Sequence, residues 1–99
     1  MSKQDISKFE DALLKAYGLL QQFGQPAWAK RIYEIGGQLQ EGHWDAANTF
    51  LRIYGGSGGF GEVYLSANGV PLSSENTELD ALKDELFVLA RSIKNRGPG

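Results

Sequence analysis

A glycine-rich segment just past the middle of the chain limits what this sequence can fold into. Residues 55–61 read GGSGGFG and hold five of the thirteen glycines in seven positions. Glycine is a poor helix former and readily takes positive φ, so no regular helix is expected to continue through this segment. The chain is therefore predicted to form helices that stop before residue 55 and start again beyond it.

Apolar residues at steps of three and four predict three helices ahead of the glycine segment, over residues 5–23, 26–40 and 44–54. In the second of these, Gly36 and Gly37 interrupt the pattern, and each costs about 1 kcal/mol relative to alanine in a helix interior. We expect the helix to bend there, or another backbone to pack closely against it.

Residues 62–66 carry strand-forming side chains and are predicted to form a β-strand after the glycine segment. Asn68-Gly69 is a strong hairpin signal, and residues 70–72 would form the return arm. Because Pro71 cannot donate to a ladder, the return arm should be short and at an edge. An isolated hairpin is marginal in water, so this one is expected to lie against the helices.

A fourth helix is predicted over residues 75–95, where leucines recur on one face and Ser73, Ser74 or Asn76 could cap its start. Acids gather in its first half and bases in its second, an order that matches the helix dipole. The predicted fold class is mainly α: a single four-helix domain over residues 1–99, with a short β-hairpin inserted between helices three and four.

The overall charge argues against several classes of partner. The formal net charge is −2 and the isoelectric point is about 5.3, with lysines and arginines mostly scattered singly. Nucleic-acid binders usually show a basic footprint, so neither nucleic acid nor an anionic membrane surface is expected as a partner. The chain has no cysteine, and no signal peptide is expected from its N-terminal residues. We expect a cytoplasmic protein.

Residues 56–63 match the G-x-G-x-x-G-x-V pattern of the kinase glycine loop. A kinase would also need a strand lysine and the H-R-D and D-F-G motifs, and none of these occurs. The dinucleotide fingerprint needs a strand before the glycines and a helix after them, whereas here the order is reversed. Glu62 would repel a phosphate. The glycines are expected to end a helix and turn the chain, and secondarily to contact a protein.

Side chains for catalysis or metal binding are sparse. His43 is the sole histidine and is expected at the surface near the start of the third helix. Zinc sites generally use three or four ligands, which one histidine and no cysteine do not supply. The neighbouring acids Glu10-Asp11 and Asp84-Glu85 do not face each other on a helix. The sequence therefore predicts no enzyme, no cofactor, and neither a catalytic nor a metal site.

Acidic residues dominate the start of the fourth helix. Residues 75–85 contain five acids against Lys83 alone, a local charge of −4, and Lys83 is expected on a helix face among them. This arrangement serves solubility and the helix dipole, or it forms a docking face for a basic partner. On the second interpretation, residues of the glycine segment, the strand and the acidic helix start would bind a protein partner: Ser57, Phe60, Glu62, Tyr64, Glu75, Glu78, Asp80 and Asp84.

Residues 50–65, which read FLRIYGGSGGFGEVYL, resemble the helix–GGxG–strand signature of a family of small bacterial proteins of unknown function. The similarity is greatest over residues 44–90. Gly61 stands where a polar residue is usual in that family, and Ser57 stands where methionine is common. These proteins resemble the immunity proteins carried beside secreted antibacterial toxins. The resemblance implies neutralisation of a cognate toxin domain in the cytoplasm, by direct binding and without an active site.

Three functions remain open on the sequence. The first is a non-catalytic binding protein, namely an immunity protein with a toxin domain as its partner. The second is a structural or regulatory helical domain that self-associates as a homodimer, through the hairpin edge or through a helix face. The third, ranked last, is small-ligand or nucleotide binding by the glycine segment.

Overall fold

The computed structural model describes residues 2–97, and the side chains of residues 4–97. Within this range are α1 (Ser2–Gln22), α2 (Pro26–Glu41), α3 (His43–Tyr54) and α4 (Ser73–Asn95). Between α3 and α4 lie a short 3-10 helix, η1 (Phe60–Glu62), and the strands β1 (Ser66–Ala67) and β2 (Val70–Pro71). The predicted fold class, mainly α with a β-hairpin between helices three and four, is confirmed.

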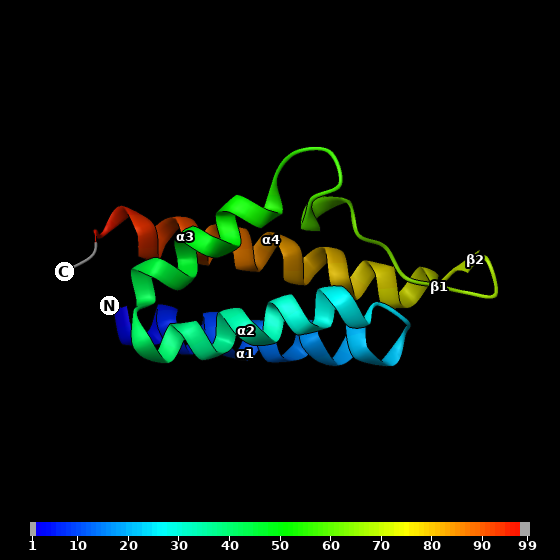
Figure 1. The fold of residues 1–99 in the computed structure, drawn as a ribbon, viewed down its shortest axis with the longest axis horizontal. Helices are drawn as coiled ribbons and strands as arrows, with labels where there is room; N and C mark the ends of the chain where they lie inside the picture. The colour runs from blue at the N-terminus through cyan, green and yellow to red at the C-terminus, as the bar shows by residue number, and fades with distance from the viewer. Residues whose placement is uncertain (1, 98–99) are drawn as a thin grey trace.

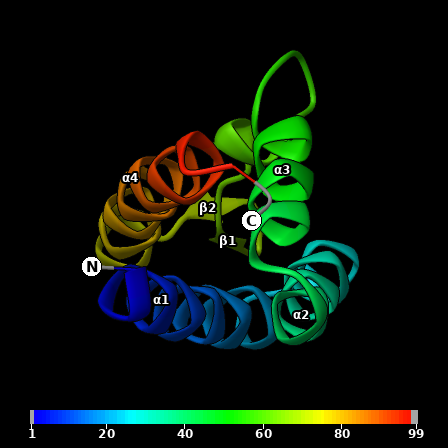
Figure 2. The ribbon, with the colours of Figure 1, turned by 90° about the vertical axis from the view of Figure 1, so that its left-hand side faces the viewer.

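The four helices enclose one core in two layers. Figure 1 shows α1 and α2 side by side in one layer, with α3 and α4 in the other, and the hairpin extending from one end. Seen end-on in Figure 2, the helices follow one another around the core in chain order, and α4 closes the ring against α1. The glycine segment leaves this ring as a loop beyond the end of α3.

Glycine and proline set the junctions between the first three helices. Gly24 follows α1 with φ +83°, a conformation that glycine adopts without strain. Pro26 is the first residue of α2, where its missing N–H costs no hydrogen bond. Gly42 takes an extended conformation between α2 and α3. At three of their starts the helices begin one to three residues earlier than predicted, because the apolar period locates a helix better than it locates its ends.

The core contains a cluster of aromatic rings contributed by distant parts of the chain. Phe50 packs edge-on against Phe9, with ring centroids 6.0 Å apart, and against Phe60 at 5.9 Å. Trp28 lies 5.5 Å from Phe60 on another side. All three phenylalanines are fully buried. The prediction that Phe60 contacts a partner does not hold in this fold, because its side chain fills the core and anchors the glycine segment there.

The predicted strand over residues 62–66 is largely wrong. Its first residue ends η1, and only Ser66 belongs to β1. Val63 and Leu65 both point into the core, and side chains of α4 bond the backbone around them. A chain whose polar backbone groups are satisfied in this way needs no neighbouring strand. Strand propensity was therefore overridden by tertiary contacts.

The hairpin turn at Asn68-Gly69 is confirmed. Both residues have positive φ, 54° and 79°, and β1 pairs antiparallel with β2 through Ser66 with Pro71 and Ala67 with Val70. The expectation that the hairpin lies on the helices is wrong, because residues 67–71 are exposed and the hairpin projects beyond the helices. It is held at its base instead, where the Leu72 amide donates to the Leu65 carbonyl at 3.0 Å.

One of the two alternatives expected for Gly36 and Gly37 in α2 is that another backbone packs closely against them, and this is not observed. The helix runs unbroken through Gly36 and Gly37. A Cβ atom built on either one would meet no atom within 4 Å. Close approach of another backbone is therefore excluded within the described residues.

Candidate functional site

The glycine segment forms a loop whose shape requires glycine at particular positions. Gly56 and Gly58 have φ of +82° and +77°, the left-handed region that side chains other than glycine seldom adopt. At Gly59 a Cβ atom would lie 2.4 Å from the Gly55 carbonyl oxygen and 2.8 Å from that of Tyr54. The loop therefore returns tightly against the last turn of α3, and a side chain at Gly59 does not fit.

Glu62 closes this loop from inside. Its Oε1 accepts a hydrogen bond from the Gly58 backbone N–H at 2.9 Å. The Gly58 amide, which could otherwise bind an anion, is therefore already bonded to the Glu62 carboxylate. The negative charge of Glu62 would also repel an anion at this place. Both observations disfavour phosphate binding by this loop. Ser57, at the exposed tip, and Glu62 itself both remain accessible to solvent.

Lys83 holds the segment that follows the loop, a role that the sequence reasoning missed. It is 5% exposed. Its Nζ donates to the carbonyls of Val63 and Gly61, the latter at 3.2 Å, and lies 3.5 Å from the Asp80 carboxylate. Lys83 does lie beside an acid on α4, as expected, but its ammonium is buried against the backbone of the neighbouring segment. The signal for its burial was its position one turn after Leu79, on the apolar stripe of α4.

Asn76 holds the next part of the same segment. Its side-chain oxygen accepts from the Leu65 N–H at 2.7 Å, and its side-chain nitrogen donates to the Leu65 carbonyl at 2.8 Å. Asn76 thus replaces a β-ladder partner and does not cap α4; neither do Ser73 or Ser74, since the helix start has no side-chain cap. Lys83 and Asn76 together attach residues 61–65 to α4.

Tyr64 is displayed on the outside of this attached segment. Its side chain is 61% exposed, while its backbone carbonyl accepts from the Gln25 side chain at 3.2 Å. A shallow depression of about 240 Å³ lies between the start of α2 and the loop, lined by residues that include Trp28, Gly59 and Glu62. Tyr64 forms part of its wall, so an aromatic ring and a carboxylate share one open surface.

The predicted acidic residues do not form one patch. Asp80 lies beside Lys83 and hence toward η1, and Asp84 follows it one turn later on the same flank. Glu78 is two residues before Asp80, and a helix places such a pair about 160° apart. Glu78 therefore faces away from the loop, and Glu75 is half-buried. We define the loop-side surface as Ser57, Glu62, Tyr64, Asp80 and Asp84.

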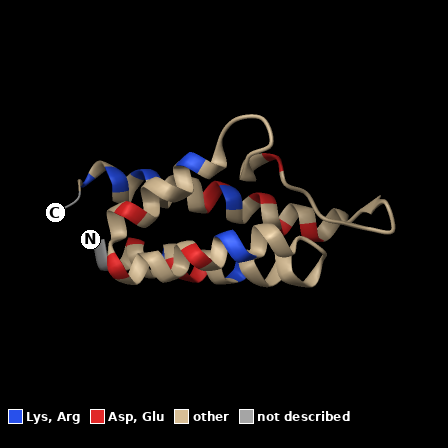
Figure 3. Cartoon of the chain, in the orientation of Figure 1, with Lys and Arg blue, Asp and Glu red and all other residues tan. Residues whose placement is uncertain are grey.

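The burial of Lys83 changes the electrostatics of this surface. Lys83 is the one base among residues 75–85. Its ammonium group donates to the buried backbone carbonyls of Gly61 and Val63 and does not face the solvent. Figure 3 shows the remaining bases of α4 near its C-terminal end, away from the hairpin. The outward-facing carboxylates Asp80 and Asp84 therefore have no exposed base in the same half of α4.

The other candidate features are the single histidine and the acidic side chains that could bind a metal ion. His43 is the first residue of α3 and is exposed, as expected. Among residues 4–97, no three side chains of histidine, cysteine, aspartate or glutamate come together where they could hold a metal ion. Within the described part of the chain, no helix combines the length and apolar character needed to cross a membrane.

Comparison of this chain with protein-family models, with curated proteins and with solved structures finds no match. The resemblance to the bacterial family with the helix–GGxG–strand signature therefore stays a prediction.

Proposed function

We propose that this chain is a non-catalytic binding protein, and specifically an immunity protein that neutralises a cognate antibacterial toxin domain in the cytoplasm. The observation that carries the proposal is the loop-side surface, where exposed Tyr64 and Glu62 sit on a segment held in place by α4, and exposed Asp80 and Asp84 lie on α4 itself. Tyrosine is enriched among the residues that dominate binding energy at protein interfaces.

Rigidity supports the proposal. A recognition surface loses less conformational entropy on binding when its backbone is already ordered. Here Phe60 is buried, Lys83 bonds the carbonyls on either side of Glu62, and Asn76 bonds both backbone groups of Leu65. The segment carrying Tyr64 therefore has little freedom to lose.

Charge supports a basic partner. Glu62, Asp80 and Asp84 are exposed, and the adjacent lysine is buried beneath them. A surface of one sign accelerates encounter with an oppositely charged partner and suppresses wrong partners. The partner domain is accordingly proposed to present lysine or arginine side chains around a pocket that receives Tyr64.

The test begins with the protein encoded by the adjacent gene. The two proteins are co-expressed, and complex formation is measured by size exclusion with light scattering alongside rescue of growth. We expect a complex and rescue. Tyr64→Ala should weaken binding by about 2 kcal/mol, the range of an interface hot spot. Asp80→Lys with Asp84→Lys should mainly slow association, and more strongly at low salt.

A matched control is Val88→Ala, which removes another exposed apolar side chain from the outer face of α4. It should leave the affinity unchanged. If the two proteins form no complex and growth is not rescued, the proposed function is wrong. If they bind but Tyr64→Ala binds as well as the unaltered chain, the function stands and the assignment of the loop-side surface fails.

A second candidate function, self-association, is favoured by a different face of the molecule. The groove between α1 and α2 is apolar, and it lies away from the glycine loop.

A further inference from the structure

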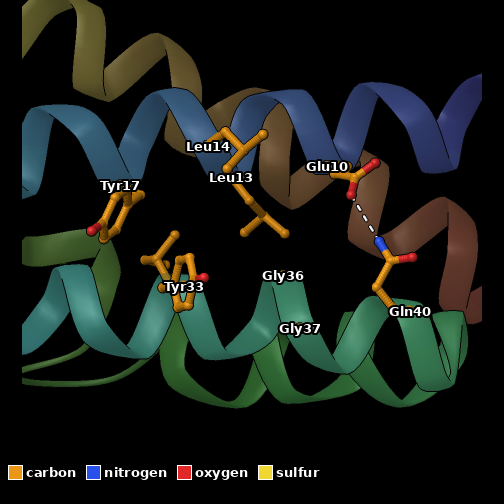
Figure 4. Close-up of a pocket in the computed structure, with 9 residues that line it drawn as sticks. Glu10, Leu13, Leu14, Tyr17, Tyr33, Gly36, Gly37 and Gln40 are labelled. Carbon is orange, nitrogen blue, oxygen red and sulfur yellow. Dashed lines mark hydrogen bonds between the residues drawn. The ribbon is translucent and has the colours of Figure 1, made fainter.

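An apolar groove runs between α1 and α2 on the outer side of their layer (Figure 4). Its volume is about 250 Å³. The rings of Tyr17 and Tyr33, 5.3 Å apart, approach each other across it at one position, and the Gln40 amide donates to the Glu10 carboxylate at 2.8 Å at another. At its edge, Leu14 is 56% and Tyr33 is 62% exposed. Two large apolar side chains thus flank a groove that no residue of the described range 4–97 fills.

Glycines line the α2 side of this groove. Gly36 and Gly37 both lie in the helix interior, where each weakens the helix by about 1 kcal/mol relative to alanine. The space beside their α-carbons is open, so the packing of a single chain does not require them. Glycines allow a helix from another chain to approach the backbone closely. On α1, exposed Gly18 likewise has open space beside it.

The two bridges across the groove fix how α1 and α2 are aligned. Glu10 lies opposite Gln40, and Tyr17 lies opposite Tyr33. The two helices therefore run antiparallel, and the numbers of two residues that face each other add up to 50. The middle of the groove therefore lies at residues 13–14 of α1 and 36–37 of α2.

Charges on the exposed face separate about this middle. Exposed Asp11 and Glu41 lie toward one end, and exposed Lys15, Lys30 and Arg31 lie toward the other, with Lys8 as the exception on the acidic side and Glu34 on the basic side. Figure 3 shows acids toward the end of the α1–α2 layer that holds the N-terminus of α1. If a second copy packs against this face with its helices running in the opposite direction, the acidic end of each copy lies against the basic end of the other.

We propose that the α1–α2 face binds a second copy of this chain, with equivalent helices running antiparallel across a two-fold axis. In this arrangement Asp11 of one copy faces Lys15 of the other, and Lys30 faces Glu41. Gly37 lies on or beside the axis, where α2 crosses its equivalent and a side chain would hold the helices apart. Such an interface is isologous, so each contact occurs twice.

The size of the face sets the expected strength. A helix of 16 residues is about 24 Å long, and two adjacent helices present a face roughly 20 Å wide. The area covered is then about 500 Å² on each copy, or about 1,000 Å² in total, which is below the range of stable specific interfaces and typical of weak, transient ones. We therefore expect a dimer that forms and dissociates with concentration. This surface is separate from the loop-side surface, and the proposal does not depend on toxin binding.

The first experiment uses the absence of cysteine from the chain. A single Leu14→Cys substitution places a thiol beside the axis at an exposed position of α1, and mild oxidation should yield a disulfide-linked dimer on a non-reducing gel. Val88→Cys, on an exposed position of α4, is the matched control and should remain monomeric under the same conditions. Equal cross-linking of the two variants would overturn the proposed face.

The second experiment measures self-association of the unaltered chain by sedimentation equilibrium, up to about 1 mM protein. Asp11→Lys brings like charges together twice and should raise the dissociation constant at least about tenfold. The swap Asp11→Lys with Lys15→Asp should restore dimerisation, and Glu85→Lys should have no effect. A monomer throughout the concentration range overturns the proposal, as does a dimer that Asp11→Lys leaves unchanged.

Discussion

The buried ammonium of Lys83 donates a hydrogen bond to the carbonyl of Val63, which precedes it by 20 residues. It donates a second to the carbonyl of Gly61 at 3.2 Å. A side chain of α4 therefore takes the place of a backbone partner for the segment after the glycine loop. This substitution allows the segment to run across the helices without belonging to a sheet.

Replacing Lys83 with methionine should destabilise the protein. The apolar chain is kept, but the carbonyls of Gly61 and Val63 lose their donor while buried. We expect a loss of about 1–3 kcal/mol in the free energy of unfolding, measured by urea denaturation. Amide hydrogen exchange should increase over residues 60–65. Lys94→Met, at an exposed position of the same helix, should change stability little. Unchanged exchange in Lys83→Met would contradict the anchoring role.

Asn76→Ala tests the second attachment of the same segment. The substitution leaves both the N–H and the carbonyl of Leu65 without the bonds seen here. The unfolding free energy should fall by about 1–3 kcal/mol, and exchange at the hairpin base should rise. Asn95→Ala, at the exposed end of α4, serves as the control. Equal stability of the two variants would show that Leu65 finds other partners.

Gly59→Ala tests the tight return of the glycine loop. The added methyl would lie 2.4 Å from the Gly55 carbonyl oxygen, so the loop must shift or strain. We expect a loss of at least about 2 kcal/mol in stability, together with a changed NMR environment for Gly58. Gly55→Ala is a control within the same loop, because its φ is −90° and a Cβ there meets nothing within 4 Å. A Gly59→Ala protein as stable as Gly55→Ala would contradict the geometry.

Acid should weaken the contact that joins the two ends of the chain. A hydrogen bond from Arg96 lowers the pKa of Asp5 below its ordinary 3.8, with a smaller contribution from the Ser92 hydroxyl and partial opposition from burial. A carboxyl group with a lowered folded-state pKa stabilises the fold above its unfolded pKa. That contribution is lost as pH falls through the lower, folded value.

The measurement compares urea unfolding of the unaltered chain and Asp5→Asn between about pH 7 and pH 2. The unaltered chain should be the more stable near neutral pH, and the difference should shrink below about pH 4. Asp84→Asn, which changes an exposed carboxylate, is the reference. A stability difference for Asp5→Asn that is independent of pH would exclude this linkage.

Local rules were sufficient for the helices and the turn. The period of the apolar residues predicted the four helices, because burying one face of a helix requires side chains at steps of three and four. Asn68-Gly69 specified its turn because both residues tolerate positive φ. The loop at residues 55–59 likewise follows from glycine's conformational freedom.

Only the tertiary structure decided which side chains of the candidate site face outward. Phe60 and Tyr64 are both aromatic residues near the glycine loop, yet the first is in the core and the second is exposed. Lys83 and Asp80 are charged neighbours on one helix, yet the lysine is buried. The sequence pattern indicates on which side of a helix a residue lies. Whether that side chain is buried depends on which other segments of the chain pack against that side and which backbone carbonyls they present. Those partners come from segments about 20 residues away, whose approach no local pattern encodes.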